Sequence, residues 1–146
     1  MFNARQFRDL VTRVLMELHP DIPVSDVAVC LLMGTAAQES RLGTFLRQCG
    51  GGPALGVFQM EVTTFNWLRD KYPRYLRGRQ AQELEWDLKL GIIAARLRYW
   101  AMPEDLPPSS SPGVLAAYWK QHYNTPAGGG RIEDFVRNYQ SYVEGR

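Results

Sequence analysis

The sequence has few of the residues that bind metal ions or form disulfide frameworks. It contains two cysteines and two histidines among 146 residues. There is no CxxC pair and no histidine cluster, so we expect neither a metal site nor another cofactor. Cys30 falls in an apolar stretch and Cys49 in an irregular one. This spacing defines no disulfide framework, and it leaves open whether the two cysteines pair.

The chain also lacks a long uninterrupted apolar run. No segment approaches the roughly 20 apolar residues that a helix needs to cross a membrane. The first 20 residues, MFNARQFRDLVTRVLMELHP, carry charges throughout and do not resemble a secretory signal. We therefore expect a protein that is made in the cytoplasm, has no signal peptide and does not span a membrane.

The sequence also has only a small excess of positive over negative charges. The formal net charge of +2 is too small to indicate nucleic-acid binding by itself. Between Arg41 and Arg79, however, seven basic residues stand against two acidic ones, and Arg69–Arg79 is the densest part. A solvated face is the simpler interpretation of this stretch. Contact with an anionic polymer, such as cell-wall glycan or nucleic acid, is the alternative.

What the sequence does contain is a set of helical patterns that fits one domain over residues 1–146. A chain of this length buries about two-thirds of its unfolded surface, enough for a core. Residues 3–19 have apolar side chains at helical spacing and end at a His-Pro pair. The following segment, Val27–Met33, is apolar on every side, which predicts a buried central helix capped by Ser25 or Asp26.

The rest of the chain predicts a mainly α fold, α+β at most. Between residues 43 and 60 we expect an irregular loop or a minimal sheet, because no helical period is visible there. Helices are predicted for 62–72, 84–100, 114–123 and 132–143. In the second of these, Trp86, Leu90, Ile93, Leu97 and Trp100 follow one another at helical steps, so we expect both tryptophans in the core.

Glu39 follows the apolar run of the predicted central helix, near the C-terminal end of that helix. A carboxylate at the C-terminal end of a buried helix lies in a low dielectric and near the negative end of the helix dipole. Both effects raise its pKa, and a carboxylic acid that is still protonated near neutral pH can act as a general acid on a glycosidic bond. A single glutamate at a helix end is more often an ordinary solvated residue. The surrounding residues are therefore needed to distinguish this interpretation from a catalytic acid.

Two phrases around Glu39 resemble the lysozyme-like lytic transglycosylases, a family that includes soluble lytic transglycosylases and goose-type lysozymes. The phrases are AQESRLG at residues 37–43 and GVFQMEVTT at residues 56–64. The resemblance implies a lysozyme-like helical domain in which Glu39 is the catalytic acid. It also implies that Ser40, Gly56, Phe58 and Gln59 contribute to substrate binding.

The family's third motif, an Ala-Tyr-Asn phrase followed by glycine, has two possible counterparts. Ala117-Tyr118 begins it correctly, but Trp119 stands where the family has asparagine. Tyr123-Asn124 comes later and precedes three glycines. By the resemblance, Tyr118 would line the cleft and hold the catalytic glutamate, while Tyr123 and Asn124 would lie at the rim; alternatively, the second pair is the true counterpart.

The resemblance implies cleavage of the β-1,4 bond between N-acetylmuramic acid and N-acetylglucosamine in bacterial peptidoglycan. Glu61 and several later acidic residues are present, but none stands in a family motif, so one recognisable carboxylate favours a lytic transglycosylase with 1,6-anhydro products. A muramidase, which hydrolyses the same bond and normally uses a second carboxylate, is the alternative. A non-catalytic glycan-binding or virion structural module on the same fold is another.

A cell-wall substrate without a signal peptide requires a route out of the cytoplasm. Release through a phage holin, carriage on a phage particle and injection by a secretion system all satisfy this requirement. We favour a bacteriophage enzyme that acts in the periplasm or on the cell wall. We expect a monomer whose polymer partner is peptidoglycan and not nucleic acid.

Overall fold

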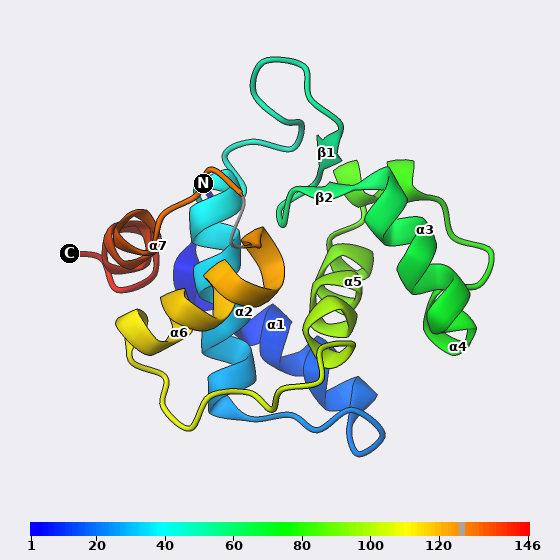
Figure 1. Ribbon diagram of the computed structural model, residues 1–146, viewed down its shortest axis with the longest axis horizontal. Coiled ribbons are helices and arrows are strands. Elements are labelled where there is room, and N and C mark those ends of the chain that lie inside the picture. The colour runs from blue at the N-terminus through cyan, green and yellow to red at the C-terminus, as the bar shows by residue number, and fades with distance from the viewer. Residues whose placement is uncertain (126–127) are drawn as a thin grey trace.

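A computed structural model describes residues 1–125 and 128–146, and these residues are mainly helical (Figure 1). The predicted fold class, mainly α with a minimal sheet, is confirmed. The α-helices are α1 (Ala4–Leu18), α2 (Asp26–Ser40), α3 (Val62–Lys71), α4 (Pro73–Leu76), α5 (Leu88–Trp100), α6 (Pro112–Trp119) and α7 (Ile132–Asn138). The strands are β1 (Ala54–Leu55) and β2 (Met60–Glu61), and short helical turns are η1 (Ala81–Glu85), η2 (Lys120–Asn124) and η3 (Tyr139–Val143).

Helix α2 is the central element, as its apolar sequence predicts. The Ser25 hydroxyl accepts a hydrogen bond from the Ala28 N–H at 3.1 Å and so caps its first turn. Helices α1, α5, α6 and α7 all pack against it, and Figure 1 shows α2 near the middle of the molecule. At Gly34 a Cβ atom would lie 2.4 Å from the Phe135 ring, so the close approach of α7 depends on glycine.

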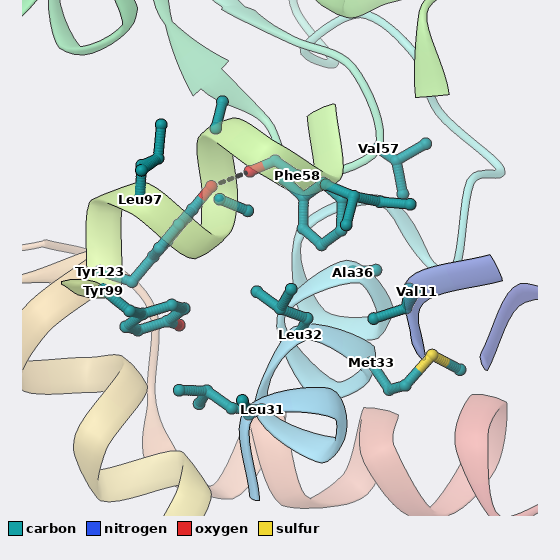
Figure 2. Close-up of a cluster of buried hydrophobic side chains, with 14 of the residues drawn as sticks. Val11, Leu31, Leu32, Met33, Ala36, Val57, Phe58, Leu97, Tyr99 and Tyr123 are labelled. Atoms are coloured by element: carbon teal, nitrogen blue, oxygen red, sulfur yellow. Dashed lines mark hydrogen bonds between the residues drawn. The ribbon is translucent and has the colours of Figure 1, made fainter. Parts of the chain in front are cut away.

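The core continues from α2 into the other half of the molecule. Figure 2 shows Leu32 of α2 near Phe58 from the β1–β2 turn, with Leu97 of α5 on the far side of the cluster. The side chains of Leu32 and Leu97 are both fully buried. One hydrophobic cluster therefore joins the helices around α2 to the hairpin.

Strands β1 and β2 form a two-residue antiparallel hairpin, with Ala54 opposite Glu61 and Leu55 opposite Met60. The turn between them starts at Gly56, whose φ of +82° is readily accessible to glycine. A Cβ atom there would lie 2.3 Å from the backbone oxygen of Leu84. The hairpin is thus seated directly on the η1 turn.

The predicted helix over residues 84–100 is interrupted, and its two tryptophans are not in the core. Trp86 is 69% exposed and Trp100 is 42% exposed. The Asp87 carboxylate accepts a hydrogen bond from the Leu90 N–H at 2.9 Å, so that a new helix, α5, begins after Trp86. Leu90 and Leu97 of the same stripe are buried, so the middle of the stripe does face the core. The two tryptophans are exposed because Trp86 precedes α5 and Trp100 is its last residue.

The other predicted helices are confirmed, with the last two each ending in a π-helical turn, η2 and η3. Within residues 1–125 and 128–146, no helix combines the length and the apolar character that a membrane crossing requires. Cys30 is buried and Cys49 is exposed, and neither forms a disulfide.

We predict that Gly56→Ala lowers the free energy of unfolding by about 1–3 kcal/mol, because the new methyl group meets a backbone oxygen at a positive φ. Urea denaturation followed by circular dichroism measures the change. Gly78→Ala is the matched control, since its φ is +78° but its Cβ would have nothing within 4 Å. Equal losses in both variants would show that the contact with Leu84 is unimportant.

Candidate active site

Glu39 lies one residue before the end of α2, where the chain turns sharply. Arg41 and Leu42 adopt left-handed conformations, with φ of 51° and 54°. The Ser40 hydroxyl donates to the Ala36 carbonyl at 3.1 Å and accepts from the Gly43 N–H at 2.9 Å. These bonds satisfy backbone groups at the helix end and direct the chain into the loop that leads to β1.

A cleft of about 690 Å³ opens beside Glu39. Its walls come from the end of α2, the loop before β1, the hairpin, α3, α5 and the η2 turn. Most of the side chains that line it are polar or charged. Among the lining residues are Glu39, Gln59, Glu61, Thr64, Arg98, Tyr123, Asn124 and Thr125.

The Glu39 carboxyl has a raised pKa of about 7 against an ordinary value of 4.5. Burial is the main cause, because a carboxylate deprived of water loses more solvation than a neutral acid does. A hydrogen bond from Trp119 and the positive charge of Arg98 act in the opposite direction and lower the pKa. The net result is a carboxyl group poised to hold or release a proton near neutral pH.

Trp119 holds the Glu39 side chain in place. Its indole Nε1 donates a hydrogen bond to Glu39 Oε2 at 3.0 Å. The Trp119 side chain is fully buried and packs against Phe135 of α7, with 5.4 Å between ring centroids. The indole N–H can only donate, so Glu39 Oε2 must accept and cannot carry a proton directed at Trp119. In the neutral acid the proton is therefore on Oε1.

Arg98 supplies the positive charge that acts on Glu39 in the cleft. Its guanidinium donates to the Tyr123 carbonyl at 2.5 Å and lies 4.1 Å from the centroid of the Tyr123 ring. These contacts attach the outer part of α5 to the η2 turn. Arg98 thereby brings a fixed cation near a carboxyl group that becomes charged whenever it gives up its proton.

Three of the predicted binding residues do line the cleft with Glu39: Gln59, Tyr123 and Asn124. Gln59 has a positive φ of 47°, and its side-chain amide donates to the Gly56 carbonyl at 2.9 Å. The buried Tyr123 hydroxyl donates to the Phe58 carbonyl at 2.6 Å, as Figure 2 shows. Asn124 accepts a hydrogen bond from Lys120 at 2.8 Å.

Three other predicted binding residues have structural roles and are not among the cleft-lining residues. Ser40 is fully buried and caps the end of α2. Gly56 allows the hairpin turn to rest on η1. Phe58 is only 2% exposed and packs in the core, so that it offers the site its backbone carbonyl alone, as the acceptor for Tyr123.

The assignment of Tyr118 to the cleft is also wrong. Its hydroxyl donates to the Glu104 carbonyl at 3.0 Å, and its ring lines a separate pocket that includes Trp100. Of the two candidate pairs, Tyr123-Asn124 is the one that lines the cleft.

Sequence reasoning missed Trp119 and Arg98. Trp119 directly follows Ala117-Tyr118, where the resemblance leads one to expect asparagine, and this mismatch was the available signal. Nothing in the sequence around Arg98 indicates its role, because only packing brings α5 and η2 together. Glu61, weighed as a second carboxylate, is exposed on β2 and lines the same cleft as Glu39.

Comparisons with models of known protein families, with curated proteins and with solved structures find no match for this chain. Within the described residues, no group of three or more histidine, cysteine, aspartate or glutamate side chains could hold a metal ion.

We predict that Glu39→Gln raises the free energy of unfolding above pH 7 but leaves it nearly unchanged at pH 4. Because the folded pKa of Glu39 lies above the unfolded one, the unfolded chain binds fewer protons between pH 4.5 and 7. The wild-type protein therefore loses stability as the pH rises through this window, by on the order of 3 kcal/mol in total. Glutamine, which does not ionise, avoids the loss.

Urea denaturation of both proteins at pH 4 and pH 9 measures this difference. Gln38→Asn is the matched control, because it changes a neutral side chain beside Glu39 in the same cleft. The control should differ from wild type equally at both pH values. A Glu39→Gln variant that behaves in the same way would show that the Glu39 carboxyl has no raised pKa.

Proposed function

We propose that this protein is a peptidoglycan-cleaving glycosidase of the lytic transglycosylase type, with Glu39 as its general acid and base. The observation that carries the proposal is a carboxyl group with a pKa of about 7, hydrogen-bonded on one oxygen and open to a polar cleft. The motif resemblance of the surrounding residues supports the substrate, which is the β-1,4 bond between N-acetylmuramic acid and N-acetylglucosamine.

In the proposed reaction, Glu39 Oε1 donates its proton to the glycosidic oxygen as the bond from that oxygen to the muramic acid anomeric carbon breaks. The glutamate then accepts the proton of the C6 hydroxyl of the same sugar, whose oxygen bonds to the anomeric carbon. The proton count balances, and no water is consumed. Trp119 keeps Oε2 occupied, and the Arg98 charge favours the transient carboxylate.

A muramidase is the second candidate, and Glu61 is the observation in its favour. Its carboxylate lines the same cleft as Glu39 and stands on the short strand β2. In this version Glu61 would activate a water molecule or stabilise the cation that develops at the anomeric carbon. A non-catalytic glycan-binding module is a third version, in which the cleft binds the polymer but leaves it intact.

Access to peptidoglycan is part of the proposal. We propose delivery by a bacteriophage, either through a holin or on the phage particle, with a secretion system as the alternative. Two residues of the basic stretch Arg69–Arg79 make internal contacts: Arg69 donates to the Arg79 carbonyl, and Arg79 pairs with Glu83 and Asp87. These contacts favour a structural role for Arg69 and Arg79, whereas Lys71, Arg74 and Arg77 are exposed.

The test is digestion of purified peptidoglycan followed by mass spectrometry of the soluble fragments. Wild type should give 1,6-anhydro-muropeptides, lighter by one water than the hydrolysis products. Glu39→Gln should lower the rate by about 10²–10⁴-fold, the usual worth of general acid–base catalysis. Glu61→Gln should retain activity, because the transglycosylase reaction needs no second carboxylate.

Two results would contradict this assignment in different ways. If wild type yields fragments with reducing ends, and Glu61→Gln no longer produces them, the enzyme is a muramidase that uses Glu61. Binding without any fragments from wild type would identify a glycan-binding module.

The proposal also predicts how Trp119 sets the pH dependence. In wild type, kcat/KM for cell-wall cleavage should fall as the pH rises through about 7, because Glu39 must be protonated to act as the acid. Trp119→Phe removes a hydrogen bond that favours the ionised carboxylate, so the falling limb should move to higher pH. Trp100→Phe, a change of an exposed tryptophan, should leave the limb in place. An unmoved limb in Trp119→Phe would remove this role from Trp119.

A further inference from the structure

A second hollow, which we call the Trp67 pocket, adjoins the cleft. It has a volume of about 400 Å³ and lies between α3, the end of α5 and the η2 turn. Thr64, Arg98 and Thr125 line both the cleft and this pocket. The two hollows are therefore neighbours on the protein, separated by no more than these three residues.

Trp67 stands on the α3 side of this pocket and is 48% exposed. It follows Thr64 by three residues, so both side chains lie on the same face of α3. One such step along a helix is roughly 4.5 Å. Trp67 therefore lies about one helical turn along α3 from Thr64, which lines both hollows.

We propose that Trp67 forms a remote sugar-binding subsite that holds the glycan strand beyond the bond that Glu39 cleaves; this inference rests on the proposed function. The ring presents an apolar surface with a polar edge, which suits a sugar that has C–H bonds on its faces and hydroxyl groups around its edge. The pocket's polar neighbours, Thr63 and Gln121, offer hydrogen-bonding groups beside that surface.

The charges around the Trp67 pocket fit the same occupant. Arg98 lines it, and the Lys71 ammonium lies 5.8 Å from the centroid of the Trp67 ring. The lactyl group of each muramic acid ends in a carboxylate once the stem peptide is removed, and intact stem peptides carry carboxylates of their own. A positive border therefore favours peptidoglycan strands over neutral glycans.

The decisive measurement is the affinity for peptidoglycan strands of defined length, made on the Glu39→Gln background so that strands stay intact. Strands freed of stem peptides, with two, four, six and eight sugars, are titrated by calorimetry. Affinity should rise with length in the parent. Adding Trp67→Ala should weaken the binding of the longer strands by about tenfold or more, since truncation of a buried aromatic anchor has effects of this size. The shortest strand should bind as before.

Matched variants distinguish the loss of sugar stacking on the Trp67 ring from a general disturbance of the structure. Trp67→Gln, a polar side chain at the same exposed helical position, should show the same loss, whereas Trp67→Phe should retain most of the affinity. Trp86→Ala removes another exposed tryptophan that lines neither hollow and should change nothing.

Equal affinities of the parent and both Trp67 truncations for every strand length would overturn the Trp67 subsite while leaving the proposed function intact. A parent protein that binds no strand of any length would overturn the proposed function, and this inference with it.

Discussion

The hydrogen bond from Trp119 to Glu39 is the contact on which the site depends. It joins the end of α2 to the end of α6 at 3.0 Å, inside a region where an unpaired carboxylate would be expensive. The bond satisfies one oxygen and leaves the other to carry the proton. Burial raises the pKa of Glu39 while this bond restrains the rise, so the carboxyl titrates near neutral pH.

The helical framework could be read from the sequence because each helix has a local signal. The apolar run of α2 and its Ser25 cap predicted both its place in the centre and its start. The failure at Trp86 and Trp100 has a clear physical cause. The stripe is buried at Leu90 and Leu97, but Trp86 lies before the start of α5 and Trp100 is its last residue. Periodicity tells which residues share a face of a helix, but not where the helix begins or how far along it the core extends.

The site was only partly predictable, for a related reason. Glu39 and Gln59 stand in recognisable phrases, and both line the cleft. Ser40 and Phe58 stand in the same phrases, yet they support the site from within the core. A motif records which residues occur together, and it does not separate those that face the ligand from those that shape the backbone. Arg98 has no local signal at all, because its role arises from the packing of α5 against η2.

The buried bond from the Tyr123 hydroxyl to the Phe58 carbonyl links η2 to the hairpin turn next to Gln59, and so ties together two walls of the cleft at 2.6 Å. Any motion that moved these walls apart would break this bond and leave a buried donor and a buried acceptor without partners, at a cost of about 1–3 kcal/mol. The bond therefore opposes any widening of the cleft between η2 and the hairpin. If the cleft binds a glycan strand, as proposed, a strand that already fits this spacing would be favoured over one that requires the two walls to separate.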